Sequence, residues 1–292
     1  MIIDCHAHYE PRLLPDDALL AQMDQSKIDK MVLIPLLTNP PEGKKPDILM
    51  KIQRFMYCSN LLRPLGIFIT KSMYKQDGQW NNWLGGGKKE ENTYNIVLRP
   101  DNDMVHSLIE RNPTRFMAWI LINPHDPDHM QEFEKFEKKS TTVGIKLHPF
   151  WHKFAIKQAE PILERAQEAG LPVCFHLGFD EGGDYEWVVN RFPDLKIIFS
   201  HLGVPYYKEV WKAVGARPNV FFDISSTYHV SRSLVKQAVK TLGADKIMYG
   251  TDCPYSHDDV IPRIKKWVDE LDISQQEKDM IFRDNFHRVI GR

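Results

Sequence analysis

The chain begins with the segment MIIDCHAH, which places an aspartate and two histidines at alternate positions. In a β-strand, residues two apart point to the same face, so Asp4, His6 and His8 would share one face. Ile3, Cys5 and Ala7 would then share the other. Two imidazoles at the end of one strand can bind one cation. The pair alone is weak evidence, because histidines that only satisfy hydrogen bonds in a core have the same spacing.

Further polar residues lie near the ends of later apolar segments. They are Lys146 and His148 in TVGIKLHP, His176 in VCFHLG, His201 in IIFSHLG and Asp252 in MYGTDCP. Burying such groups in apolar strands costs several kcal/mol each unless they are paired or bind a metal. One shared metal site therefore explains these polar residues better than separate, unrelated reasons for each residue do. Neutral imidazoles with one carboxylate favour Zn²⁺, with Mn²⁺ as the alternative.

Eight short apolar segments must position these residues. They span 1–8, 30–37, 115–124, 142–149, 171–178, 195–203, 220–226 and 246–254. Several are almost continuously apolar, as is typical of parallel strands covered on both faces, and amphipathic segments lie between them. Eight strands alternating with helices predict a (β/α)8 TIM barrel over residues 1–292, with its site at the carboxyl ends of the strands. An open, doubly wound sheet is the alternative, although such sheets usually have fewer strands.

Residues 38–100 interrupt this alternation as a long insertion after the second strand. The insertion holds ten Lys or Arg, five Asp or Glu and seven aromatic residues, so it is basic within a chain of net charge −1. A long loop that leaves the carboxyl end of a barrel strand commonly covers the site, and we expect a lid that contacts the substrate. Arg54, Arg63 and Arg99 are candidates to bind a substrate carboxylate. A surface excursion or an oligomer contact is the alternative role.

The composition argues against several classes of protein. Because 38 basic residues nearly balance 39 acidic ones, the chain gives no support for a nucleic-acid or membrane partner. The four cysteines show no paired framework, and the first residues lack the pattern of a signal peptide. We therefore expect a cytoplasmic protein that acts on a small molecule. A homodimer is compatible with these observations.

Several segments in combination resemble the amidohydrolase-related family, the branch of the amidohydrolase superfamily that includes aminocarboxymuconate-semialdehyde decarboxylase. They are DCHAH, GIKLHP, FHLG, RFPDLKIIFSHLG, RPNVFFDIS, YGTDCPY and DNFHRVIG, within residues 1–37 and 115–292. The resemblance implies one divalent metal ion with four ligands, which are His6, His8, His176 and Asp252. It also implies that His201 lies beside a metal-bound water and assists proton transfer.

Two residues of the fourth strand have less certain roles. Some relatives carry a modified lysine that bridges two metals, but this branch generally uses one metal. We therefore expect Lys146 to be unmodified and to contact the substrate or a neighbouring carboxylate. His148 would line the pocket, although it could equally cap a loop.

This constellation supports hydrolysis, because a divalent ion can lower the pKa of a bound water to roughly 7. Asp252 can take the proton or orient that water, and His201 can act as a general base. We therefore expect a metal-dependent hydrolase of a small, carboxylated organic substrate. The same centre could instead serve the non-oxidative decarboxylation of a small organic acid. A catalytically silent barrel used for binding is a second alternative, against which the intact ligand set argues.

Overall fold

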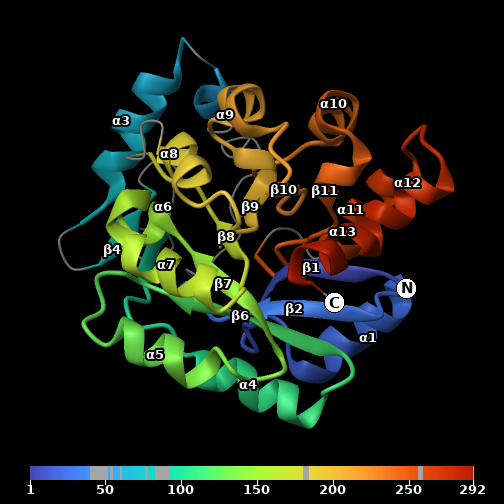
Figure 1. Cartoon of the computed structure of the whole chain (residues 1–292), viewed down its shortest axis with the longest axis horizontal. Coiled ribbons are helices and arrows are strands. Elements are labelled where there is room, and N and C mark those ends of the chain that lie inside the picture. Colours follow the sequence, from blue (N-terminus) through green and yellow to red (C-terminus); the bar gives the residue numbers. More distant parts are fainter. Residues whose placement is uncertain are drawn as a thin grey trace.

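The structure is a computed structural model that describes residues 1–39, 52, 55–59, 61–75, 78–82, 92–179, 184–255 and 259–291. Eight parallel strands form one sheet, with neighbours in the order β1-β2-β6-β7-β8-β9-β10-β11. The backbone N–H of Cys5 donates to Tyr249 O (2.9 Å), and that of Thr251 donates to His6 O (3.1 Å). These bonds join the first strand to the segment around the last one. The sheet therefore closes into the predicted (β/α)8 barrel, with helices around it (Figure 1).

Each barrel strand lies within one of the eight apolar segments of the sequence. The strands are β1 (Ile3–His8), β2 (Lys30–Ile34), β6 (Phe116–Ile122), β7 (Thr142–Leu147), β8 (Val173–Phe175), β9 (Ile197–Phe199), β10 (Val220–Asp223) and β11 (Ile247–Met248). The helices between and after them are α1 (Asp16–Ser26), α4 (Asn102–Arg111), α5 (His129–Phe136), α6 (Pro149–His152), α7 (Glu160–Glu168), α8 (Asp184–Arg191), α9 (Tyr207–Val214), α10 (Arg232–Leu242), α11 (Val260–Asp269), α12 (Gln275–Asp279) and α13 (Asn285–Ile290). No helix in the described part of the chain has both the length and the apolar character needed to cross a membrane.

Two apolar clusters explain why the strand segments are nearly continuously apolar. One combines strand residues such as Leu33 and Phe175 with buried helix residues such as Phe133, so it lies between the strands and the helices. The other takes members from all eight barrel strands, among them Trp119 and Phe221, and from α13, so it fills the barrel interior. Because both faces of each strand are buried, apolar side chains are favoured on both faces.

A β-bulge in β1 changes which of its side chains face the barrel interior. The pairing of β1 with β2 shifts between Asp4 and Ala7. Cys5 consequently belongs to the interior cluster, whereas Ala7 belongs to the cluster beneath the helices. The expectation of simple alternation along this strand is therefore wrong, because the extra residue of a bulge reverses the alternation after it.

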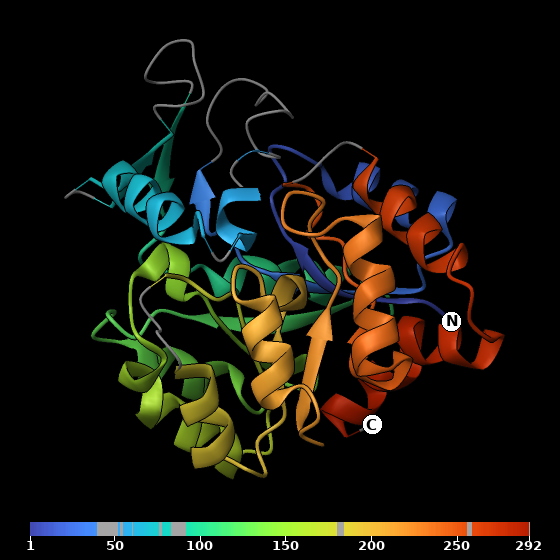
Figure 2. The ribbon, with the colours of Figure 1, turned by 90° about the horizontal axis from the view of Figure 1, so that it is seen from above.

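The insertion forms a small unit of its own. Its strands β3 (Thr38–Asn39), β4 (Gln79–Asn81) and β5 (Thr93–Ile96) make an antiparallel sheet in the order β3-β5-β4, and helix α3 spans Arg63–Met73. Figure 2 shows α3 and this sheet together at one side of the barrel. Arg63 Nη1 and Glu209 Oε1, 2.7 Å apart, tie α3 to α9. Arg54 lies outside the described residues.

Candidate active site

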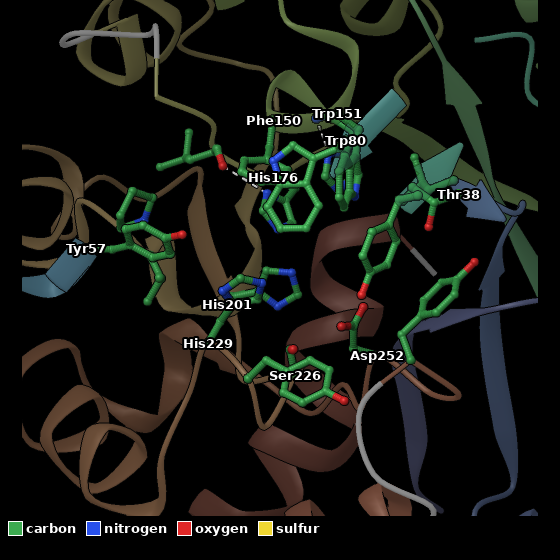
Figure 3. Close-up of a pocket in the computed structure, with 18 of the residues that line it drawn as sticks. Thr38, Tyr57, Trp80, Phe150, Trp151, His176, His201, Ser226, His229 and Asp252 are labelled. Carbon is green, nitrogen blue, oxygen red and sulfur yellow. Dashed lines mark hydrogen bonds between the residues drawn. The ribbon is translucent and has the colours of Figure 1, made fainter. Parts of the chain in front are cut away.

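A cavity of about 180 Å³ opens at the carboxyl ends of the barrel strands. Residues at the strand ends, or within a few residues after them, line it; they are His8, His148, His176, His201, Ser226 and Asp252. The insertion adds Thr38, Tyr57, Trp80 and Tyr94 to the lining. The strand ends and the insertion therefore build one pocket, with imidazoles and Asp252 facing a group of aromatic rings (Figure 3).

Four histidines at strand ends share one hydrogen-bonding arrangement. Their Nδ1 atoms contact Asp223 Oδ2 (His6, 2.9 Å), Pro35 O (His8, 3.4 Å), Leu177 O (His176, 2.9 Å) and Ser225 O (His201, 3.0 Å). Because each partner is an acceptor, the proton of each neutral ring resides on Nδ1 and the lone pair on Nε2 is left available. Metal-binding histidines typically have this arrangement, in which the second nitrogen donates to a carboxylate or a backbone carbonyl.

Asp252 supplies a carboxylate next to these imidazoles. Its Oδ1 lies 3.3 Å from His8 Nε2 and 3.5 Å from His6 Nε2. The ring centroids of His176 and His201 are 4.7 Å apart, and those of His6 and His201 are 5.1 Å apart. His6, His176 and Asp252 therefore lie next to His201, and His8 lies beside Asp252. Their nitrogen and oxygen donors are of the kind that binds a divalent ion.

Three residues that follow consecutive strands have left-handed backbone conformations. The φ angles are 54° at His201, 66° at Ser226 and 64° at Asp252, which follow β9, β10 and β11. This conformation costs roughly 1 kcal/mol for a residue other than glycine, and such strain is concentrated at functional sites. The backbone N–H of Asp252 donates to His6 O (2.7 Å), which holds the turn against β1.

Burial sets the protonation states of the site. It is the main cause that lowers the pKa of His6 and places the pKa values of His176 and His201 well below the usual range. Burial alone would raise the pKa of Asp252, but the neighbouring His8, and less strongly His6, hold it below its usual value. Neutral imidazoles and an ionised carboxylate are the forms that bind a cation.

Asp223, at the end of β10, was not identified from the sequence as a site residue. Its carboxylate is 1% exposed and accepts hydrogen bonds from His6 Nδ1 (2.9 Å), from the backbone N–H of His201 (3.0 Å) and from the backbone N–H of Ser225 (3.1 Å). Burial alone would raise its pKa, but His6 and His201 hold it far below the usual range. The signal was an aspartate at the end of the apolar segment VFFD, in the position where other strands carry site residues.

Three residues that were expected to contact the substrate do not line the cavity. Lys146 Nζ donates to Ser200 Oγ (2.7 Å) and Cys174 Sγ (3.5 Å) and is fully buried. Arg63 pairs with Glu209, and the Arg99 side chain is 66% exposed with its Nε 3.6 Å from Asp126. The part of the lining that the structure describes contains no lysine or arginine, so the expected arginine clamp is not found there. The two arginines instead lie next to carboxylates of the barrel.

His148 has both of the roles considered for it. It lines the cavity, and its Nδ1 accepts a hydrogen bond from the backbone N–H of Trp151 (3.2 Å), which caps α6. Because Nδ1 is an acceptor here, the proton of the neutral ring lies on Nε2. His148 therefore differs from His6, His8, His176 and His201, and it can donate a hydrogen bond from Nε2 into the cavity.

One wall of the cavity is aromatic. The rings of Trp80 and Trp151 meet edge to face, with centroids 5.5 Å apart, and Tyr94 stacks on Trp151 at 5.8 Å. Phe150 belongs to α6, as Trp151 does, and the ring centroids of Phe150 and His176 are 5.7 Å apart. The insertion thus supplies part of this wall, and α6, which the sequence reasoning did not single out, supplies the rest.

Known decarboxylases resemble this chain in sequence and in fold. Gamma-resorcylate decarboxylase from Polaromonas sp. (strain JS666) is 21% identical over 243 residues, which cover 64% of this chain and 74% of that protein. The structure of 2,6-dihydroxybenzoate decarboxylase complexed with 2,6-dihydroxybenzoate has a TM-score of 0.61, 17% identity, and coverage of 99% of this chain and 98% of that one. The structure of dihydroxybenzoic acid decarboxylase from Polaromonas sp. JS666, with bound manganese and the inhibitor 2-nitroresorcinol, has a TM-score of 0.61 and 16% identity. The match covers 99% of this chain and 96% of that one. At these identities the structural likeness establishes the fold.

The expectation of a hydrolase is wrong. The relatives reported above are decarboxylases, which break a carbon–carbon bond and are lyases. The residues at the strand ends could not separate the two reactions, because the same imidazoles and carboxylate could serve either. The comparisons favour the decarboxylase alternative.

The profile of the amidohydrolase family matches residues 77–292, which is more than half of the chain. The match contains His176, His201 and Asp252 but not the two histidines of β1. In the structure, however, His6 and His8 both lie next to Asp252. The chain therefore belongs to the amidohydrolase family.

Proposed function

We propose that this protein catalyses the metal-dependent, non-oxidative decarboxylation of a small aromatic acid. One observation carries the proposal: imidazoles whose Nε2 atoms are available for a metal share a cavity with an aromatic wall. The likeness to gamma-resorcylate decarboxylase supports the reaction type.

In this proposal, one divalent ion is held by His6, His8, His176 and Asp252. Three neutral imidazoles and one carboxylate fit such an ion, and the partner at each Nδ1 orients its ring. Zn²⁺ and Mn²⁺ both suit these donors, and manganese is bound in a decarboxylase of the same fold. When bound, the ion supplies positive charge that attracts a carboxylate and stabilises developing negative charge.

The size and lining of the cavity indicate the kind of substrate. A cavity of about 150 Å³ can hold benzene, so the volume of about 180 Å³ suits one six-membered ring with small substituents. The rings of Phe150, Trp80 and Trp151 offer edge-to-face and offset contacts to such a ring. The carboxylate would then face the imidazoles at the other side of the cavity.

The reaction breaks the bond between a ring carbon and the carboxylate carbon. The electron pair of this bond stays on the ring carbon, which takes up one proton, and carbon dioxide leaves. No oxidant or reductant is required. His201 can relay the proton, because its Nδ1 faces the carbonyl oxygen of Ser225 and its Nε2 is left for the cavity. His148 can donate a hydrogen bond from Nε2 to an oxygen of the substrate.

The test is to load the purified protein with Zn²⁺ or Mn²⁺, incubate it with a panel of single-ring aromatic acids, and measure carbon dioxide release and the ring product. We expect turnover of at least one acid that disappears when the metal is chelated and returns on reloading. Asp252→Asn should be inactive, whereas the exposed matched variant Asp194→Asn should behave as wild type. Failure of the metal-loaded protein to release carbon dioxide from any acid of the panel would reject the proposal.

A further inference from the structure

Tyr57 of the insertion lines the cavity at one end of a chain of aromatic ring contacts. The ring centroids of Tyr57 and Phe179 are 5.3 Å apart, and those of Phe179 and Phe150 are 5.4 Å apart. All three residues line the cavity, so its aromatic wall continues from α6 to the insertion. Figure 3 shows Tyr57 on the side of the cavity opposite Thr38. Tyr57 therefore bounds the space for a substrate ring on that side.

Helix α3 packs closely against the Tyr57 side chain. Tyr57 Oη and Thr70 Oγ1 lie 2.6 Å apart and form a hydrogen bond. Gly66, one turn before Thr70 on the buried face of α3, faces the ring, and a Cβ atom added to it would lie 3.1 Å from Tyr57 Cδ1. This distance is shorter than an ordinary van der Waals contact. A glycine inside a helix is less favourable than an alanine, and the close approach of the ring gives Gly66 its physical reason.

The backbone of Tyr57 is held as well. Arg63 Nε donates to Tyr57 O (2.9 Å), and Arg63 Nη1 and Nη2 donate to the two carboxylate oxygens of Glu209 in α9 (2.7 and 3.3 Å). The Arg63 side chain is only 11% exposed, and its Cζ lies 5.1 Å from the ring centroid of Tyr206. Tyr206 Oη donates to Phe179 O (3.3 Å). The guanidinium group therefore joins the insertion to the barrel beside the cavity wall.

We infer that Tyr57 is a specificity-determining residue that sets the largest ring system the cavity accepts. This inference rests on the proposed function, because it assumes that the carboxylate of an aromatic acid faces the imidazoles and that its ring lies along the aromatic wall. The cavity volume of about 180 Å³ suits a single six-membered ring. A second, fused ring would need space that the Tyr57 side chain occupies. Because its hydroxyl group, ring and backbone are all held, Tyr57 cannot move aside without losing these contacts.

A purely structural role for Tyr57 makes a different prediction. If Tyr57 only stabilised the insertion, its removal would weaken the binding of every aromatic acid alike. If Tyr57 limits the size of the ring system, its removal gives a selective gain for larger acids, and damage to the fold does not produce such a gain.

The experiment measures calorimetrically how the metal-loaded protein binds benzoate, 1-naphthoate and 2-naphthoate, in which the second ring projects in two different directions. Tyr57→Ala removes the ring, whereas Tyr57→Phe keeps the ring and removes only its hydroxyl group. Phe68→Ala is the matched control, because Phe68 belongs to α3 and is 71% exposed. Metal content and circular dichroism are measured on the same samples, and Tyr57→Leu replaces Tyr57→Ala if the latter does not fold.

We expect the wild-type protein to bind benzoate about tenfold or more tightly than either naphthoate. Tyr57→Ala should reduce this preference about tenfold for at least one naphthoate, keep benzoate within about threefold of wild type and retain its metal. Tyr57→Phe and Phe68→Ala should keep the wild-type preference.

The inference would be overturned if both naphthoates stay excluded from a folded, metal-loaded Tyr57→Ala protein, or if they bind the wild-type protein as well as benzoate does. An equal loss for all three acids would overturn it too. If the wild-type protein neither binds nor decarboxylates any single-ring acid, the proposed function fails, and the inference fails with it. If it decarboxylates such an acid but Tyr57→Ala shows no selective gain, only the role of Tyr57 fails.

Discussion

Asp223→Asn is expected to weaken metal binding without removing any proposed ligand. Asp223 Oδ2 faces His6 Nδ1 (2.9 Å), while Oδ1 faces the backbone N–H groups of His201 (3.0 Å) and Ser225 (3.1 Å). Oδ1 also accepts a hydrogen bond from Ser225 Oγ. All of these partners are donors, but an amide has only one oxygen. If that oxygen faces His201 and Ser225, the amide NH₂ group faces His6 Nδ1. Facing the NH₂ group, Nδ1 can only accept, and its other neighbour, Ser225 Oγ at 3.1 Å, is able to donate to it. The proton of His6 is then favoured on Nε2, the atom that would bind the metal.

The opposite amide orientation is disfavoured. It would leave two buried backbone N–H groups facing an NH₂ group. Each unsatisfied donor would destabilise the folded protein by about 1–3 kcal/mol. We therefore expect the altered tautomer of His6 to dominate and metal affinity to fall about 10- to 100-fold, as is typical when the partner of a metal-binding histidine is lost. At 1.36 kcal/mol per tenfold change, this corresponds to about 1.4–2.7 kcal/mol of binding free energy.

The assay is competition for Zn²⁺ between the metal-free protein and a chromogenic chelator. His6→Ala, which removes a proposed ligand, should lose more affinity than Asp223→Asn, and Asp194→Asn should bind as wild type. Wild-type affinity in a folded Asp223→Asn protein would refute the tautomer argument. A loss of affinity accompanied by unfolding in the absence of metal would show that Asp223 acts on the fold instead.

Three further predictions concern individual histidines. His6→Ala and His176→Ala should each lose the metal by elemental analysis, and full occupancy in both would reject the ligand set. His201→Ala should retain the metal but lose about 10²–10⁴-fold in turnover, since it is proposed to relay a proton; a wild-type rate, or loss of the metal, would contradict that role. Burial, with a smaller effect of Lys139, lowers the pKa of His106 to about 4 from the usual 6.5. The folded protein therefore binds a proton at His106 less well than the unfolded chain does. As a result, the folded state loses stability as the pH falls through 6.5 toward 4. The contribution is about 2 kcal/mol at pH 5 relative to pH 7.5. His106→Phe can stack on Phe136 in the same way. In this variant, the unfolding free energy measured by chemical denaturation should fall less between pH 7.5 and pH 5, by about that amount. An unchanged pH dependence would contradict the pKa assigned to His106.

The sequence alone determined the barrel and the candidate metal ligands. Parallel strands buried on both faces must be apolar, so eight apolar segments could be recognised without knowledge of their contacts. The carboxyl ends of barrel strands meet at one face, so polar residues that end such segments were expected to come together. His6, His8, His176 and Asp252 were chosen on this basis and with the family resemblance. In the structure His6 and His8 lie beside Asp252, and His176 lies beside His201.

Only the tertiary structure decided which partner each long or polar side chain has. Arg63 pairs with a glutamate 146 residues away, and Lys146 donates to a serine 54 residues away, so neither reaches the cavity. The bulge in β1 depends on the register with β2, and the role of Asp223 depends on its contact with a histidine 217 residues earlier. Contacts of this kind leave no local pattern, because they follow from how the closed barrel brings distant segments together. The aromatic wall of α6 and the insertion arises in the same way, and it gives the cavity a shape that the strand ends alone did not predict.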